Sequence, residues 1–284
     1  MTDSYEHFLI KSYNSTFNMS IKETPIQYVI YLGGKKKGCV ELFIDKPPSD
    51  PRYSLFFDAT IAKLTRVEYD SHCSLEGLVS GEGTRNMLRT TFDVLRNDNR
   101  FQHVKTVDLD DASYVTCPDG GSLSLAHLSI ATNGATWYEK HFQAVLKNPV
   151  LHNDYMKAKK IFQTKLSDLP PYEIIFRDNP LLHTQEFIQV YKRSQNLNDF
   201  FTTIRKKDKE QFCKIMNTWL ETFVNKLLNN IGNQTWRIDL ENPIFKRNLT
   251  ISVQPLNNAP EYMTGGGPFI QHKPRKPTHT FDDL

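Results

Sequence analysis

The pattern of apolar and polar positions changes along the chain and divides it into segments of different character. The run PIQYVIYLGG is rich in β-branched and aromatic residues, and GCVELFIDKPP alternates so that Val40, Leu42 and Ile44 share one face. The glycines and lysines of LGGKKKGCV between them suit a turn. The sequence therefore predicts a β-hairpin, followed by further strand material in RYSLFFDATIAKLTRVEYDS.

Helical spacing begins directly after the glycine pair of VSGEGTRNML. The residues that recur with the helical period are Met87, Leu88, Thr91, Phe92 and Leu95. A short strand over 104–109 follows, and then helical material that is interrupted near Asn133 and Gly134. This order predicts an α/β (α+β) protein with a mixed sheet. The glycine loop would lie at the carboxyl end of a strand, where open sheets tend to bind ligands.

From about residue 150 the pattern becomes mainly helical, with proline breaks at DLPPYE and RDNPLL. The segment EQFCKIMNTWLETFVNKLLNNIG has one apolar stripe, made by Phe212, Ile215, Met216, Trp219, Phe223, Leu227 and Ile231. This stripe is expected to be buried inside the chain's own second domain. TWRIDL and NLTISVQPL predict two more strands, and the Gly- and Pro-rich end has no period.

These patterns predict three regions. Residues 1–149 form an α/β domain, residues 150–262 a mainly helical α+β extension, and residues 263–284 a flexible Gly/Pro/basic tail. In the tail, QHKPRKP carries Lys273, Arg275 and Lys276 between prolines. A solvated linker and an arm that docks on a protein partner both remain open for it.

Composition narrows the classes of function. The 284 residues include 35 basic and 32 acidic side chains, and a net charge of +3 is too balanced to favour a nucleic-acid partner. The four cysteines form no CxxC pair, and no HExxH motif occurs, so no metal site is expected. Isolated cysteines and the lack of a secretory signal or an apolar span predict a reducing, cytoplasmic location without membrane contact.

The loop GEGTR, residues 81–85, is the first candidate for chemistry. Gly81 and Gly83 would let a ligand approach the backbone, and the N–H groups of residues 82–85 would point at an anion with the support of the helix dipole. A third glycine is missing for a dinucleotide fingerprint, and no Gly-Lys-Ser/Thr follows for a P-loop. A pyrophosphate cradle of another type and a simple turn into a helix both remain.

A second run, GATWYEKHF, carries a family resemblance. A strand that feeds a GxG-type loop, then a helix, a strand and a helix with YEK before an aromatic resembles the GNAT superfamily of acyl-CoA-dependent N-acetyltransferases. Residues 81–85 match the glycine part of the family's Q/R-x-x-G-x-G/A loop, and residues 138–142 match its YEKxGF run. The resemblance covers about residues 25–146. A GxTWYExxF-like run is also similar to one in proteins of large DNA viruses.

The resemblance implies a GNAT-like fold and acyl transfer from acetyl-CoA, as co-substrate, to an amine, without a metal. It implies that the coenzyme contacts Gly81, Glu82, Gly83, Thr84, Arg85 and Asn133. Tyr138 would protonate the departing thiolate, and its alternative role is that of an ordinary helix residue. Glu68, near the end of a predicted strand, is a candidate base, although such carboxylates are usually only solvated.

Departures from the family pattern keep a second hypothesis open. Leu78 stands where the family has Gln or Arg, and YEKHF lacks the glycine of YEKxGF. The alternative is a non-catalytic structural or interaction protein on a degenerate acyltransferase scaffold, with the virion as its location. An open groove beside the glycine loop would favour the enzyme, and bulky side chains that fill the groove would favour the alternative.

Overall fold

A computed structural model describes residues 3–48, 58–68, 71–78, 82–111, 113–117, 121–216, 219–228, 234–245, 251–260 and 278–280. The chain divides into two compact units. The first contains Met1–Asp110 and Arg237–Pro277, and the second contains Asp111–Trp236 and Thr278–Leu284. The expected boundary near residue 149 lies inside the second unit. The fold is mixed α/β, as the sequence pattern predicts.

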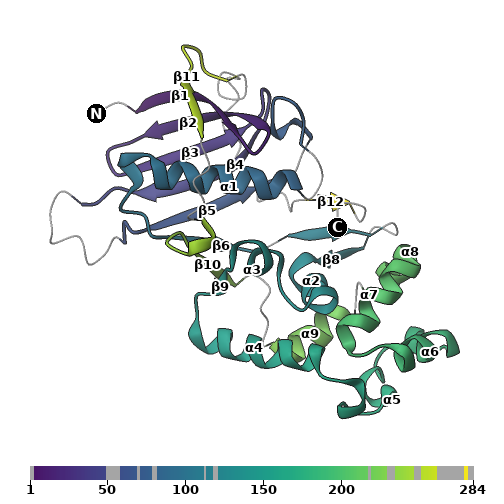
Figure 1. The fold of residues 1–284 in the computed structure, drawn as a ribbon. Helices are drawn as coiled ribbons and strands as arrows, with labels where there is room; N and C mark the ends of the chain where they lie inside the picture. The colour runs from purple at the N-terminus through teal and green to yellow at the C-terminus, as the bar shows by residue number, and fades with distance from the viewer. Residues whose placement is uncertain are drawn as a thin grey trace. The chain divides into compact units, whose positions relative to one another are not determined.

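A mixed sheet forms the first unit (Figure 1). Its first strands follow one another antiparallel: β1 (Ser4–Ser12), β2 (Ser15–Glu23), β3 (Gln27–Gly33), β4 (Gly38–Asp45) and β5 (Ile61–Val67). The predicted hairpin is β3–β4. Strand β6 (Thr106–Asp110) pairs parallel with β5, and β11 (Ser252–Pro255) pairs antiparallel with β1. Strand β10 (Thr235–Asp239) lies next to β6 in the strand order and crosses the boundary between the units.

Helix α1 (Glu82–Asn97) crosses one face of this sheet and connects β5 to β6 (Figure 1). Its apolar positions Met87, Leu88 and Phe92 are completely buried, as the helical period predicts. Side chains at alternate positions of the strands form the other half of the core, among them Ile10, Phe17, Ile30, Leu42 and Ile44. Each such side chain contributes about 1.5–3 kcal/mol when it leaves water. A right-handed β-α-β crossover is the usual way to join parallel strands.

The β1–β2 hairpin, which the sequence pattern did not reveal, closes on two residues with positive φ. Tyr13 has a φ of 50° and Asn14 a φ of 59°, as the central residues of a type I′ turn require. The Tyr13 hydroxyl donates to Asp93 Oδ2 on α1 over 3.0 Å. This bond ties the hairpin tip to the helix.

The second unit joins a small sheet to a helical array. Strands β7 (Tyr114–Thr116) and β8 (Ser122–Ser124) pair antiparallel, and β12 (Thr278–Thr280) pairs parallel with β7. Most of the predicted tail lies outside the described residues. The remaining elements are α2 (Leu125–Asn133), α3 (Trp137–Phe142), β9 (Val145–Leu146), α4 (Pro149–Gln163), α5 (Tyr172–Ile175), α6 (Gln185–Arg193), α7 (Leu197–Lys207), α8 (Lys209–Met216) and α9 (Leu220–Leu228).

Aromatic rings fill the core of this second unit. The segment with the apolar stripe contains two helices, α8 and α9, and Trp219 directly precedes α9. Trp219 stacks on Phe223 with ring centroids 4.5 Å apart and also contacts Phe176 and Phe201. Burial inside the chain is therefore confirmed for Phe212, Ile215, Met216 and Trp219, whereas the side chains of Leu227 and Ile231 lie outside the described part of the chain.

The cysteines overturn the reasoning that led to a reducing compartment. Cys39 forms a disulfide with Cys73 in the first unit, and Cys117 forms one with Cys213 in the second. The prediction of isolated thiols was wrong because both pairs are distant in sequence, at separations of 34 and 96 residues. Disulfides are typical of oxidising environments. Among the described residues, no helix is long and apolar enough to cross a membrane.

Candidate functional site

The amino-terminal turn of α1 follows the carboxyl end of β5, where the sequence predicts a ligand. Glu82 is the first residue of the helix and its side chain is 63% exposed. Arg85 Nη2 lies 3.1 Å from Glu82 Oε1, so the two charges in this turn neutralise one another. Thr84 is buried, and Gly81 lies outside the described residues. Any attraction for an anion therefore comes mainly from the backbone N–H groups and the helix dipole.

Gly83 is a glycine for a reason that the sequence did not show. A Cβ at this position would lie 2.8 Å from the Cβ of Leu78 and 3.0 Å from its Cδ2. Leu78 is buried and packs directly against the helix backbone. The missing side chain of Gly83 thus makes room for a residue of the same chain.

Glu68, the predicted base, comes directly after β5. Its carboxylate lies 3.1 Å from Lys37 Nζ and its side chain is 24% exposed. The backbone N–H of Glu68 donates to the carbonyl oxygen of Cys39 over 2.8 Å. This carboxylate is therefore paired with an ammonium group rather than only solvated.

The predicted residues Asn133 and Tyr138 belong to the second unit, whereas Glu68 and residues 82–85 belong to the first. Asn133 is the last residue of α2, and its exposed side chain donates to Ser129 Oγ over 3.5 Å. Gly134 follows with a φ of 73° and caps the helix. This local capping accounts for the Asn-Gly pair.

Three residues of the TWYEKHF run help to hold α3 in place. Thr136 caps the helix through its side chain, which accepts from the N–H of Glu139 over 3.2 Å. The Glu139 carboxylate accepts a hydrogen bond from the Tyr155 hydroxyl and pairs with Lys159, both on α4. Phe142 is completely buried. A run that resembles a catalytic motif therefore has structural roles at several of its positions.

Tyr138 differs from its neighbours because it interacts electrostatically with a buried carboxyl group, that of Asp111. Burial, and then the carboxylate of Asp111, raises the pKa of its hydroxyl. Asp111 is 5% exposed, and burial also raises the pKa of this carboxyl although the Ser113 hydroxyl donates to it over 2.5 Å. The raised pKa of Tyr138 opposes a tyrosinate. Tyr138 can therefore donate a hydrogen bond, but it is a poor source of a proton.

Asp111 is a site residue that sequence reasoning missed. It directly follows β6, so the chain carries its carboxyl to the end of that strand. In the sequence it sits in the acidic stretch DLDDAS, which indicates only a solvated turn. Its burial, not its type or spacing, distinguishes it from its neighbour Asp110, which is exposed.

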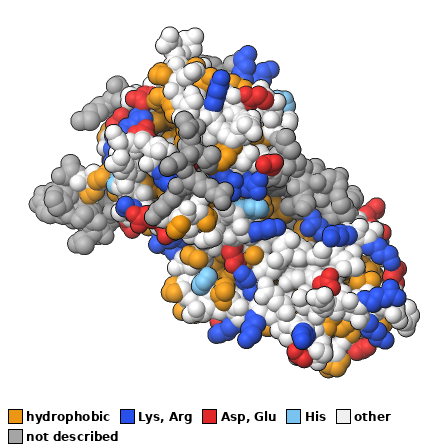
Figure 2. Space-filling view, viewed as in Figure 1, with side chains coloured by type: hydrophobic (Ala, Val, Ile, Leu, Met, Phe, Trp, Pro, Cys, Tyr) orange, Lys and Arg blue, Asp and Glu red, His pale blue; other side chains and the backbone are white. Residues whose placement is uncertain are grey.

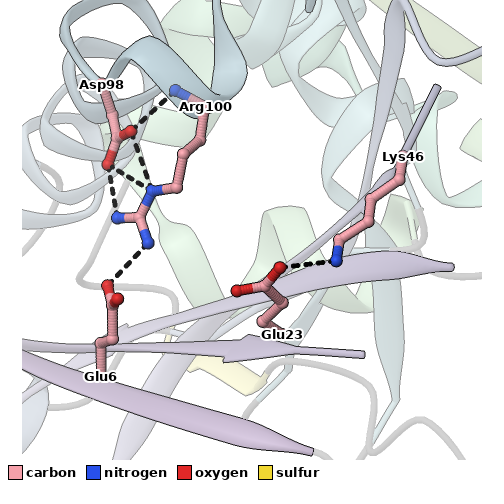
Figure 3. Close-up of polar contacts among 5 residues, drawn as sticks. All are labelled: Glu6, Glu23, Lys46, Asp98 and Arg100. Carbon is pink, nitrogen blue, oxygen red and sulfur yellow. Dashed lines mark hydrogen bonds and ion pairs between the residues drawn. The ribbon is translucent and has the colours of Figure 1, made fainter. Parts of the chain in front are cut away.

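A second charged cluster lies at the far end of α1 (Figure 3). Arg100 donates to Asp98 over 2.6 Å through Nη2 and to Glu6 over 2.6 Å through Nη1, while Lys46 Nζ lies 2.6 Å from Glu23. Hydrogen bonding to Asp98 raises the pKa of Arg100. Each acid in this cluster has a basic partner. We therefore assign the cluster a structural role, in which Arg100 fastens β1 to the end of α1.

The face shown in Figure 2 carries side chains of both charge signs among the described residues, with Lys and Arg interspersed with Asp and Glu. One shallow hollow of about 390 Å³ lies at the start of α4, lined by residues such as Leu146, Asn148 and Gln234, and it contains none of the predicted site residues. In the described part of the chain, no His, Cys, Asp and Glu side chains form a group of three that could hold a metal.

Comparison with known proteins adds no family to this geometry. None of the family models, curated proteins or solved structures compared with the chain matches it. Function is therefore inferred from the residues of the chain and their arrangement.

Proposed function

We propose that this protein is an acyl-CoA-dependent N-acyltransferase that transfers an acetyl-type group to an amine. One observation carries the proposal. In the β5–α1–β6 crossover, the 16-residue helix α1 follows the carboxyl end of β5, which pairs parallel with β6. That is where open α/β sheets bind phosphate-bearing ligands. The order of a strand, a helix and a strand in this crossover is also the order on which the GNAT resemblance rests.

In the proposed reaction the amine nitrogen attacks the thioester carbonyl carbon, and the carbon–sulfur bond breaks. The proton of the amine goes to Glu68, directly or through water, and the sulfur leaves as a thiolate. The N–H groups at the start of α1 hold the pyrophosphate of the coenzyme.

The charges of the first turn of α1 give a sharp test. Glu82→Gln removes a negative charge beside the proposed pyrophosphate, and Arg85→Gln removes the positive one. We expect Glu82→Gln to tighten acetyl-CoA binding and Arg85→Gln to weaken it, each by about 2- to 5-fold, as charges at a helix terminus contribute about 0.3–1 kcal/mol. The measurement is the rise in melting temperature with coenzyme concentration.

The matched control is Lys157→Gln, on α4 of the second unit, whose side chain is 79% exposed. It changes the net charge by the same amount as Arg85→Gln and should leave binding unchanged. Equal effects of Arg85→Gln and Lys157→Gln would argue against a site at α1. The absence of any melting shift with millimolar acetyl-CoA would contradict the enzyme.

A second candidate is a non-catalytic structural or interaction protein on the same scaffold. The packing of Leu78 against Gly83 favours this candidate. Because the Leu78 side chain fills the space beside Gly83, no ligand is needed to explain why this residue is a glycine. The structural roles of Thr136, Glu139 and Phe142 favour it too. This candidate predicts that coenzyme A and acetyl-CoA leave the melting temperature unchanged.

A further inference from the structure

A short segment between β5 and α1, residues 71–78, lies along the ends of the first strands, and we name it the strap. The N–H of Leu75 donates to the carbonyl oxygen of Thr16 on β2 over 2.8 Å. In return, the N–H of Thr16 donates to the Glu76 carboxylate over 2.8 Å. Partial desolvation acts to raise the pKa of Glu76, but its hydrogen bonds, chiefly those with Thr16, and the charge of Lys11 together leave the pKa lowered.

The middle of the strap lies against the β3–β4 hairpin. A Cβ at Gly34 would collide with the carbonyl oxygen of His72 and would lie 3.0 Å from that of Ser74, so only glycine permits this approach. Cys73 is completely buried there and forms the disulfide with Cys39 of β4, with Cα atoms 5.7 Å apart. The disulfide therefore joins the strap to β4.

The strap ends beneath the first turn of α1. The N–H of Leu78 donates to the carbonyl oxygen of Ser71 over 3.1 Å, which closes the strap on itself. The side chain of Leu78 then packs on Gly83. Any movement of the strap away from the sheet would remove the residue that supports the start of α1.

Few apolar contacts hold the strap apart from the disulfide. Ser71, His72, Leu75, Glu76 and Gly77 are exposed. Segments with few buried apolar groups open locally at a low cost in free energy. The Cys39–Cys73 disulfide therefore contributes much of what keeps the strap ordered. Without the bond, the strap would depend on Leu78 and a few hydrogen bonds.

We propose that the strap is a latch that oxidation closes, and that only the oxidised chain orders the start of α1. Cys39 and Cys73 as thiols exchange with the disulfide of an oxidant, such as oxidised glutathione or the active-site disulfide of a thiol oxidase. The sulfur–sulfur bond of the oxidant breaks, the bond between Cys39 and Cys73 forms, and two thiols of the oxidant carry away the two electrons and two protons. The consequence for coenzyme binding rests on the proposed function, whereas the latch does not.

The test compares two double variants of the full chain by amide hydrogen exchange. Cys39→Ala with Cys73→Ala should speed exchange in the strap and in the first turns of α1 by about tenfold or more, because local opening becomes easier. The matched control, Cys117→Ala with Cys213→Ala, removes the disulfide of the other unit and should leave exchange in the strap unchanged. Unchanged strap exchange in the first variant, or an equal increase in both, would overturn the latch.

A measurement on the unaltered protein guards against a variant that fails to fold. Alkylation under denaturing conditions, followed by mass spectrometry, counts the thiols of Cys39 and Cys73 during graded reduction. Strap exchange should rise in step with reduction of this pair, and exchange that stays constant when the pair is fully reduced would overturn the latch. No coenzyme is present in either experiment. Failure to bind acetyl-CoA would therefore contradict the proposed function and leave the latch standing.

Discussion

At the scale of single residues, burial changes the chemistry of groups that look ordinary in the sequence. His7 lies on β1, and its Nδ1 is 2.9 Å from the Ser20 hydroxyl of β2. Ser20 is completely buried, and burial lowers the pKa of His7. A neutral imidazole satisfies the buried hydroxyl in a way that an imidazolium, which has no acceptor, cannot.

The lowered pKa of His7 predicts a dependence of stability on pH. The unfolded chain takes up a proton near pH 6.5, before the folded chain does, so protons favour unfolding. The contribution of His7 is present above about pH 6.5 and is lost as the pH falls below it. We expect His7→Gln to show a smaller drop in melting temperature between pH 7.5 and 5.5 than the unaltered protein does.

The exposed His72 provides the control for this experiment, because His72→Gln should keep the full drop. The pKa values of three acids, Glu23, Glu76 and Asp98, are lowered. These acids affect stability near pH 4 and below, outside the range between pH 7.5 and 5.5 that is compared for His7. If His7→Gln retained the drop of the unaltered protein, another group would be its source.

At the scale of elements, the start of α1 depends on the fit between a helix and the strap. Alanine in a helix is ordinarily about 1 kcal/mol better than glycine. At Gly83, however, the new Cβ would lie 2.8 Å from Leu78 Cβ. We expect Gly83→Ala to lower the free energy of unfolding by about 1–3 kcal/mol, the usual cost of overpacking.

Leu78→Gly removes the obstructing atoms and turns this prediction into a double-mutant cycle. In that background, Gly83→Ala should be neutral or stabilising, with a coupling of about 1 kcal/mol or more between the two sites, measured by denaturant unfolding. Additive effects would mean that Gly83 is a glycine for a reason other than Leu78. A ligand that approaches the backbone would then regain weight as the explanation.

The aromatic core of the second unit leads to another prediction at this scale. Trp219 contacts Phe176, Phe201 and Phe223 and is 8% exposed. Trp219→Ala should lower the free energy of unfolding by about 3–5 kcal/mol, as removal of a large core aromatic does. Denaturant unfolding measures this loss.

Ile174 serves as the control, because it is 62% exposed in the same unit. Ile174→Ala should change stability by no more than about 0.5 kcal/mol. A Trp219→Ala variant that kept its stability but changed its elution in sizing chromatography would place Trp219 in an interface between chains.

At the scale of the whole molecule, local patterns predicted the elements better than their assembly. The β3–β4 hairpin, α1, and the break between α2 and α3 follow from periods and turn residues within a few positions. The strand predicted in NLTISVQPL is β11, but its partner is β1, at the other end of the chain. The disulfides are equally non-local, and sequence spacing cannot reveal such contacts.

The candidate site was predictable in part for the same reason. The helix that begins at the glycine pair follows from the sequence, but the sequence does not show whether Gly83 leaves room for a ligand or for Leu78. Tyr138 could be named from a resemblance, whereas its neighbour Asp111 could not, since only burial sets it apart.

The two disulfides close loops of 34 and 96 residues. In the chain-entropy estimate, each contributes about 4–5 kcal/mol to the free energy of unfolding.

We propose that the start of α1 holds the pyrophosphate of an acyl-coenzyme. Titration calorimetry of the oxidised, full-length chain with acetyl-CoA tests it most directly, with acetyl-pantetheine, which lacks the pyrophosphate, as the comparison. We predict one acetyl-CoA per chain and at least a tenfold weaker affinity for acetyl-pantetheine, a difference of about 1.4 kcal/mol or more. No heat of binding at millimolar acetyl-CoA, or equal affinities for the two compounds, would contradict the claim.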